Sequence, residues 1–230
     1  MIDGLHLPPR LPKEGARDYA LRLLRYNIVR LHLPPGAMIS AAELAEATTI
    51  SRTPFREAMQ ELSQSGILHV FPQAGSQVSF IDYNRIHEAR FIRFSLETAV
   101  SQQACDTITS AGFLRLEEIL YQQENSLNQG DLDALLEHDD RFHQSIFLLA
   151  GKGYTYQVMS GVLIHFDRIR RLGLGSRSEI KIISDHREIV EAIRSRDKAR
   201  VAHLMEAHLS RYLDEEQSIR QTFPQYFEEV

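Results

Sequence analysis

Strand-forming patterns are confined to residues 67–81, and helical patterns occupy the chain on both sides of them. Residues 67–71 and 77–81 have the apolar and β-branched character that predicts two short strands. The segment between them contains Pro72 and Gly75, which are typical of turns. A chain with one short hairpin cannot build a large sheet, so most of it must pack as helices.

Short helices are predicted before this hairpin, over residues 16–31, 41–47 and 52–65. Ser40 is a good N-cap for the second helix, and Gly66 ends the third. Three short helices followed directly by a hairpin are typical of the winged helix-turn-helix arrangement.

Beyond residue 81 the sequence predicts only amphipathic helices, punctuated by Gly, Asp and Ser. We expect them over residues 84–110, 111–129, 132–150, 154–172, 178–194 and 198–223. Such a run is typical of an all-α bundle, which makes the whole fold mainly α. The predicted organisation is a flexible N-terminal segment (1–14), a winged helix-turn-helix domain (15–82) and an all-helical domain (83–230).

Charge distribution, hydropathy and cysteine content limit the class of protein that this chain can belong to. Residues 1–82 are neutral overall, and residues 83–230 carry the whole net charge of −5, which supports two modules. No apolar run approaches the roughly 18 residues of a membrane span, and the N-terminus does not resemble a signal peptide. Cys105 is the single cysteine, so no intrachain disulfide can form, and its apolar helical neighbours predict a buried, unreactive thiol. These features fit a cytoplasmic protein that makes no membrane contact.

The third predicted helix carries side chains suited to double-stranded DNA. Arg52, Arg56 and Gln60 are spaced by four residues and share one face, while the apolar residues of the helix occupy another. Arginine bonds to guanine and glutamine to adenine in the major groove. Ser51 is expected to cap this helix, whose N-terminus also favours phosphate contact. The alternative is a small helical domain with solvated arginines.

The hairpin supplies a second candidate DNA contact. Gly75 and Ser76 are predicted at its tip, where small residues let a backbone approach DNA closely. The sequence between residues 73 and 76 contains no basic side chain, so the electrostatic contribution of this hairpin is expected to be weak.

Residues 33–40 (LPPGAMIS), 43–45 (ELA), 51–58 (SRTPFREA) and 66–68 (GIL) resemble the DNA-binding domain of GntR-family bacterial regulators. The resemblance implies that Arg52 and Arg56 contact bases or nearby phosphates. It also implies that Thr53 contacts a phosphate and that Gly75 enters the minor groove. In many relatives a basic residue stands beside that glycine, and here none does.

Three histidines of the C-terminal region lie on the apolar faces of predicted helices: His143, His186 and His208. Asp139 precedes His143 by one helical turn, so both side chains can reach one atom. Three imidazoles and a carboxylate make a reasonable ligand set for a divalent transition metal. The alternatives are hydrogen-bonded core histidines and a simple helix ion pair.

Residues 139–143 (DDRFH), 185–193 (DHREIVEAI) and 205–209 (MEAHL) resemble the FCD ligand-binding domain of the FadR subfamily. The resemblance implies an antiparallel helical bundle with a metal held by Asp139, His143, His186 and His208. Zinc is the first choice for this set, with nickel, manganese or iron as alternatives.

The same resemblance implies a small carboxylate effector, such as a sugar acid or another organic acid, on the open positions of the metal. Arg93 is the first candidate to bind it, and Arg90 is the second. The alternative for Arg93 is a surface ion pair with Glu97, one turn later. Relatives usually have Gly-Asn after the helix of His143, and here Gly151 is followed by Lys152.

Together these features predict a ligand-responsive transcriptional regulator that binds a palindromic operator as a homodimer. Repression is favoured over activation. The alternatives are a metal-dependent enzyme acting on a small carboxylate, a metal-sensing regulator without an organic effector, and a regulator with a structural metal. The enzyme is disfavoured because the sequence offers no separate base at a helical His-Glu-x-x-His spacing.

Overall fold

The computed structural model describes residues 4–174, 179–210 and 212–228, and these form two compact units. The first unit comprises the residues up to Arg85, the segment Ile164–Arg171 and the residues from Arg220 onward. The second unit comprises Ile86–Leu163 and Leu172–Ile219. The fold is mainly helical, as predicted, and its small sheet lies in the first unit.

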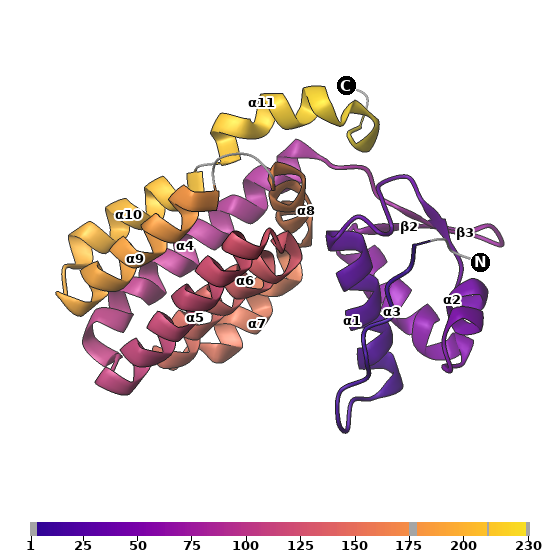
Figure 1. The fold of residues 1–230 in the computed structure, drawn as a ribbon. Helices are drawn as coiled ribbons and strands as arrows, with labels where there is room; N and C mark the ends of the chain where they lie inside the picture. The colour runs from indigo at the N-terminus through magenta and orange to yellow at the C-terminus, as the bar shows by residue number, and fades with distance from the viewer. Residues whose placement is uncertain (1–3, 175–178, 211, 229–230) are drawn as a thin grey trace. The chain divides into compact units, whose positions relative to one another are not determined.

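The first unit begins with three helices and a sheet (Figure 1). These elements are α1 (Ala16–Val29), β1 (Met38–Ile39), α2 (Ala41–Ala47), α3 (Arg52–Gln64), β2 (Leu68–Phe71) and β3 (Gly75–Val78). The sheet is antiparallel, in the order β1-β3-β2. Ser40 caps α2 as predicted: its Oγ accepts from the backbone N–H of Glu43 and donates to the Glu43 carboxylate.

The hairpin differs from the sequence expectation at two places. Strand β3 begins at Gly75, two residues before the predicted start, so the turn is shorter and lies at Pro72–Ala74. Strand β1 was not predicted, because two residues are too few to show a period-two pattern. Its pairing of Ile39 with Ser76 covers the outer edge of β3.

One hydrophobic core holds the first unit together. Side chains from α1, α3 and the hairpin meet in it, including Leu23, Ile28, Phe55 and Leu62. Ile164, the first residue of the distant helix α8 (Ile164–Gly173), is buried in the same core.

The segment before α1 is hydrogen-bonded to that helix. The buried Asn27 amide accepts from the backbone N–H of His6 and donates to the His6 carbonyl. Arg22 donates to both carboxylate oxygens of Glu14 at 2.7 Å. The N-terminal segment therefore has defined partners on α1.

The second unit is a helical bundle (Figure 1). Its helices are α4 (Tyr83–Thr107, from Ile86), α5 (Ser110–Gln129), α6 (Leu132–Leu149), α7 (Gly153–Val162), α9 (Glu179–Arg194), α10 (Lys198–Ser210) and most of α11 (Tyr212–Thr222). Helix α5 packs against both α6 and α9, α9 against α10, and α6 against α7. A short 3-10 helix, η1 (Pro224–Tyr226), follows α11.

Two predicted helices are each divided in the structure. The helix expected over 154–172 ends at Val162, and α8 begins at Ile164; the one expected over 198–223 becomes α10 and α11. Gly161 stands just before the first break, where its low helix propensity weakens continuation. Buried apolar residues continue on both sides of the break, so their spacing could not reveal it.

Polar caps fix the helix ends of the bundle. Thr109 accepts from Gly112 at the start of α5, and Asp131 accepts from Ala134 at the start of α6. Gly130 ends α5 with φ +69°, a left-handed conformation that glycine adopts without strain. Cys105 is buried as predicted, and burial raises the pKa of its thiol.

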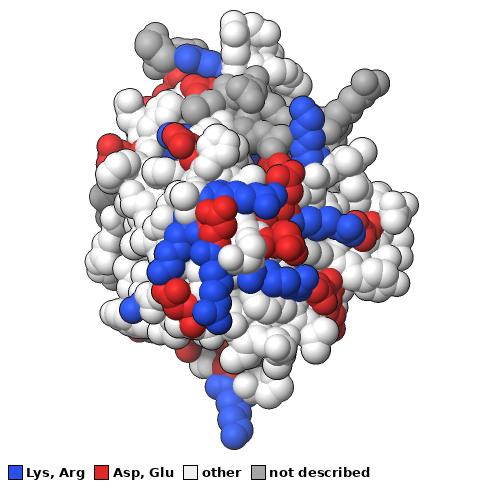
Figure 2. Space-filling model, turned by 90° about the vertical axis from the view of Figure 1, so that its left-hand side faces the viewer, with Lys and Arg blue, Asp and Glu red and all other residues white. Residues whose placement is uncertain are grey.

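One face of the bundle carries acidic and basic side chains in alternation (Figure 2). Exposed ion pairs join neighbouring helices of the bundle and include Arg187–Glu124, Arg194–Glu117 and Lys198–Asp106. Such exposed pairs contribute little stability, but they keep this face solvated. No helix among the described residues is both long and apolar enough to cross a membrane.

Candidate functional site

The predicted DNA-reading face of α3 is exposed. Arg52, Thr53, Arg56 and Gln60 all point to solvent, while Phe55, Ala58, Met59 and Leu62 are buried in the core. The segregation of polar and apolar faces is therefore as predicted. Ser51 precedes the helix, but its side chain makes no capping hydrogen bond, so that expectation was wrong.

The structure changes the interpretation of Gly75 and Ser76. Ser76 is only 3% exposed, because its side chain shares the buried face of β3 with Val78. Its side chain is therefore not presented to DNA, and the hairpin tip lies at Pro72–Ala74. Gly75 has φ +98°, and a Cβ there would lie 2.8 Å from the carbonyl oxygen of Ile39. Close approach of the β1 backbone is thus sufficient to require this glycine.

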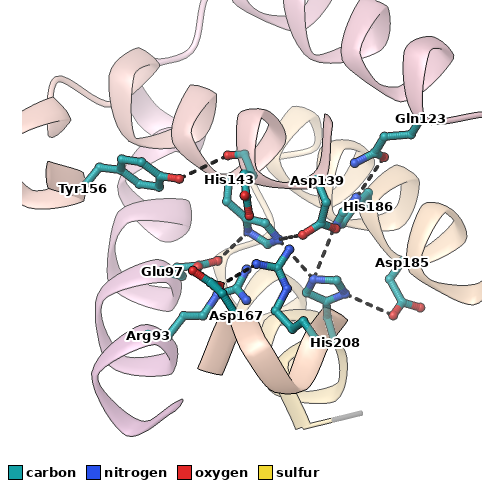
Figure 3. Close-up of polar contacts among 12 residues, drawn as sticks. Arg93, Glu97, Gln123, Asp139, His143, Tyr156, Asp167, Asp185, His186 and His208 are labelled. Carbon is teal, nitrogen blue, oxygen red and sulfur yellow. Dashed lines mark hydrogen bonds and ion pairs between the residues drawn. The ribbon is translucent and has the colours of Figure 1, made fainter. Parts of the chain in front are cut away.

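His143, His186 and His208 meet in the interior of the bundle (Figure 3). They come from α6, α9 and α10, so three helices must be in place to assemble the cluster. The Nε2 atom of His208 lies 3.2 Å from Nε2 of His186 and 3.3 Å from Nε2 of His143. The sequence correctly predicted that all three histidines face inward.

Asp139 lies beside the histidines. Its carboxylate oxygens are 3.5 Å from Nε2 of His186 and 3.8 Å from Nε2 of His143. The carboxylate is largely buried on α6, one turn before His143. The four residues identified in the sequence therefore lie around one point.

The other ring nitrogen of each histidine has its own polar partner. Nδ1 of His143 is 2.6 Å from the Glu97 carboxylate, Nδ1 of His186 is 3.1 Å from Oε1 of Gln123, and Nδ1 of His208 is 3.3 Å from the Asp185 carboxylate. Acceptors at Nδ1 place each ring proton there. The Nε2 lone pairs then point toward one another.

Electrostatics keep this cluster in a form that can bind a cation. Burial, reinforced by the neighbouring His208, lowers the pKa of His186 well below its usual value. Burial also lowers the pKa of His208, although its hydrogen bond to Asp185 opposes the shift. Burial would raise the pKa of Glu97, but Arg93 and His143 bring it down to about 2, so this carboxylate is ionised.

The residues fit a divalent metal. Nitrogen ligands about 2.1 Å from one ion lie roughly 3.0–3.4 Å apart, which matches the Nε2 spacings of this cluster. Without a cation, converging lone pairs at these distances would repel one another. Histidine ligands whose other nitrogen is held by a carboxylate or amide are the usual arrangement of protein metal sites.

The two candidate effector arginines lie on α4. Arg93 is buried, and its Nε donates to Glu97 at 2.6 Å, so the ion pair considered as an alternative exists but lies in the interior and not at the surface. Arg90 donates from Nη2 to the hydroxyl of Ser210 at 2.5 Å. Only Arg93 is linked, through Glu97, to a histidine of the cluster.

The residues that orient the imidazoles could not be identified from the sequence. Glu97 had been considered only as a partner of Arg93, and Asp185 directly precedes His186 but suggested no role. Gln123 lies on α5, where a buried glutamine carries no pattern that would point to a histidine 63 residues later. These partners are set by tertiary packing.

Comparison with known proteins gives concordant results. The profile of the bacterial regulatory proteins of the gntR family matches residues 18–78, and the FCD domain profile matches residues 88–211. The transcriptional repressor RspR of Escherichia coli is 30% identical over 219 residues, covering 95% of this chain and 96% of RspR. An uncharacterized HTH-type transcriptional regulator of Streptomyces ambofaciens is 34% identical over 222 residues, covering 94% and 90% of the two chains.

Among solved structures, Escherichia coli McbR/YncC has the same fold, with a TM-score of 0.79 at 18% sequence identity. The alignment covers 91% of this chain and 99% of McbR. The relatives are transcriptional regulators rather than enzymes.

Proposed function

The chain belongs to the GntR family of bacterial regulatory proteins and carries an FCD domain, and we propose that it is a metal-dependent repressor released by a small carboxylate. In this proposal it binds a palindromic operator as a homodimer, because two copies of α3 then read two half-sites. The observation that carries the proposal is the convergence of three Nε2 atoms in the bundle interior.

Asp139, His143, His186 and His208 are the proposed metal ligands. Their side chains lie on α6, α9 and α10, so a bound ion would link three helices of the bundle. Zinc is the first candidate, and nickel, manganese or iron suit the same donors. When bound, the ion would supply a positive centre with open positions for an oxygen ligand.

The charge around the cluster supports an anionic effector. Arg93 is a buried cation whose Nε lies 2.6 Å from the carboxylate of Glu97, and the same carboxylate lies 2.6 Å from Nδ1 of His143. Glu97 thus fixes Nε of Arg93 and links the guanidinium to the histidine cluster. Arg93 and, second to it, Arg90 are the proposed carboxylate-binding residues. The effector alters operator affinity only as far as it binds the two states of the protein differently.

On the DNA side, Arg52, Arg56 and Gln60 are the proposed base-reading residues, and Thr53 is the proposed phosphate contact. All four are exposed on α3. Gly75 remains a proposed wing contact through its backbone, which is partly exposed. The wing between residues 72 and 75 has no charged side chain, so we expect α3 to carry most of the salt dependence.

Elemental analysis of the untagged, dialysed protein tests the metal site. The parent is expected to hold close to one equivalent of metal and His143→Ala to hold little. His203→Ala is the matched control, because this exposed histidine lies on α10 with His208 and has no place in the cluster. Equal metal in all three proteins would contradict the assignment.

The effect of organic acids on operator affinity tests the proposed effector. A labelled duplex selected from random DNA by the parent is titrated with protein in the presence of metal alone, then with a panel of sugar acids and other organic acids. Release by an acid in the parent but not in Arg93→Met is expected. Affinity that follows metal and ignores every acid would favour the metal-sensing alternative.

A further inference from the structure

Helix α8 contributes to a unit from which it is remote in sequence. In the chain it lies between α7 and α9 of the bundle, yet its segment Ile164–Arg171 belongs to the first unit. Ile164 is buried in the core formed by α1, α3 and the hairpin. The winged helix is therefore completed by a segment that neither a helix pattern nor a DNA-binding motif would assign to it.

Arg168 ties α8 to the base of the hairpin. Its side chain is 0% exposed, and its Nη1 donates to the carbonyl of Ser79 at 2.6 Å. Its Nη2 donates to the carbonyl of Phe80 at 3.4 Å. Ser79 and Phe80 directly follow β3, so one guanidinium fixes the backbone where the chain leaves the sheet, at the end of β3 opposite the wing turn.

His165 extends this contact to α3. Arg168 Nη2 also donates to Nδ1 of His165 at 3.0 Å, because a guanidinium can only donate. The ring proton of His165 is therefore on Nε2, which lies 3.4 Å from the carbonyl of Ser65. Ser65 is the C-cap of α3. The chain of hydrogen bonds thus runs from the residues after β3, the second strand of the wing hairpin, through Arg168 and His165 to the end of α3.

Stability alone is a poor explanation of this arrangement. Among the described residues Arg168 has no carboxylate partner, and its Nε is buried without a hydrogen bond. A fully buried guanidinium bears a large desolvation penalty, which hydrogen bonds to neutral acceptors offset only in part. The guanidinium instead fixes the relative positions of its acceptors, because its planar set of donors holds two carbonyls and a histidine in one geometry.

We propose that Arg168 and His165 of α8 are positioning residues for DNA binding, which set the wing and α3 relative to one another. Both elements must reach the duplex together, so a shift between them weakens binding without removing any DNA-contacting side chain. This inference rests on the DNA contacts proposed above for α3 and the wing.

The test uses the full-length protein and a labelled duplex selected from random DNA by the parent. Arg168→Met is expected to bind this duplex at least tenfold more weakly and to lose hydroxyl-radical protection where the wing lies. Arg170→Met is the matched control: it removes the same charge from the same helix, and Arg170 pairs with Asp167 on α8 itself. The control is expected to bind within threefold of the parent. Metal content reports whether the bundle is intact in each variant.

If Arg168→Met does not fold, the DNA affinity of variants at His165 provides the test. His165→Leu is expected to bind at least tenfold more weakly, and His165→Gln, which keeps a donor for Ser65, is expected to recover most of the loss. Unchanged affinity and footprint in the folded Arg168 or His165 variants, or an equal loss in Arg170→Met, would overturn the inference alone. A parent that selects no duplex would overturn the proposed function as well.

Discussion

His165 should make the first unit less stable in mild acid. This side chain is 5% exposed, and burial, followed by the charge of Arg168, lowers its pKa from 6.5 to about 4. Arg85 acts in the same direction, whereas the hydrogen bond to Ser65 and the charge of Asp82 oppose the shift. The unfolded chain therefore binds a proton at His165 below about pH 6.5, while the folded chain does so only near pH 4.

The sign and size of the effect follow from this difference. The contribution of the neutral ring is complete above pH 6.5 and is lost as the pH falls toward 4. A shift of that size corresponds to about 3 kcal/mol in the free energy of unfolding, at roughly 1.4 kcal/mol for each pH unit.

Urea unfolding at several pH values between 7 and 4 measures this change in the free energy of unfolding, with tyrosine fluorescence and circular dichroism as the signals. Other groups also titrate in this range, including His186 and His208. They are common to the parent and His165→Gln, so the difference between the two proteins isolates His165. The parent should lose about 3 kcal/mol more than the variant over this range. A stability difference between the two proteins that does not change with pH, or a variant that loses more stability than the parent on acidification, would refute the reasoning.

Three other outcomes are expected. Arg52→Ala should weaken operator binding by about 1–3 kcal/mol in an anisotropy titration, and an unchanged affinity would remove Arg52 from the base-reading set. Gly75→Ala should lower the free energy of unfolding by roughly 1–3 kcal/mol, because the added Cβ would meet the Ile39 carbonyl and φ +98° suits glycine alone; a melting curve identical to that of the parent would contradict this. Glu97→Gln should lower metal affinity by about 10–100-fold in a chelator competition while leaving the ligand set intact, and full retention would show that Glu97 does not orient His143.

The inward direction of the proposed metal ligands could be predicted from the sequence because helix phase alone decides it. His143, His186 and His208 each share a face with buried apolar residues of their own helix, and Asp139 is one turn from His143. The helical repeat depends only on residues that are close in the chain, so a single sequence is enough to reveal it.

Features that depend on distant segments could not be predicted in this way. Ser76 is small and polar, and it lies in the central strand of the sheet only because the distant two-residue strand β1 pairs with β3. Gln123 holds His186 only because α5 packs against α9. In both cases the partner lies far along the chain and leaves no local pattern.

Arg168 lies between these two cases, because part of its environment was present in the sequence. It stands four residues from both Ile164 and Leu172, on a stripe that is otherwise apolar, and three residues after His165. An arginine inside an apolar stripe indicates a buried guanidinium, which must find carbonyl or carboxylate acceptors. The helical spacing does not reveal that those acceptors are the carbonyls of Ser79 and Phe80, at the base of the wing. The local pattern thus identifies a side chain that requires partners, and only the fold reveals that these partners belong to the DNA-binding unit.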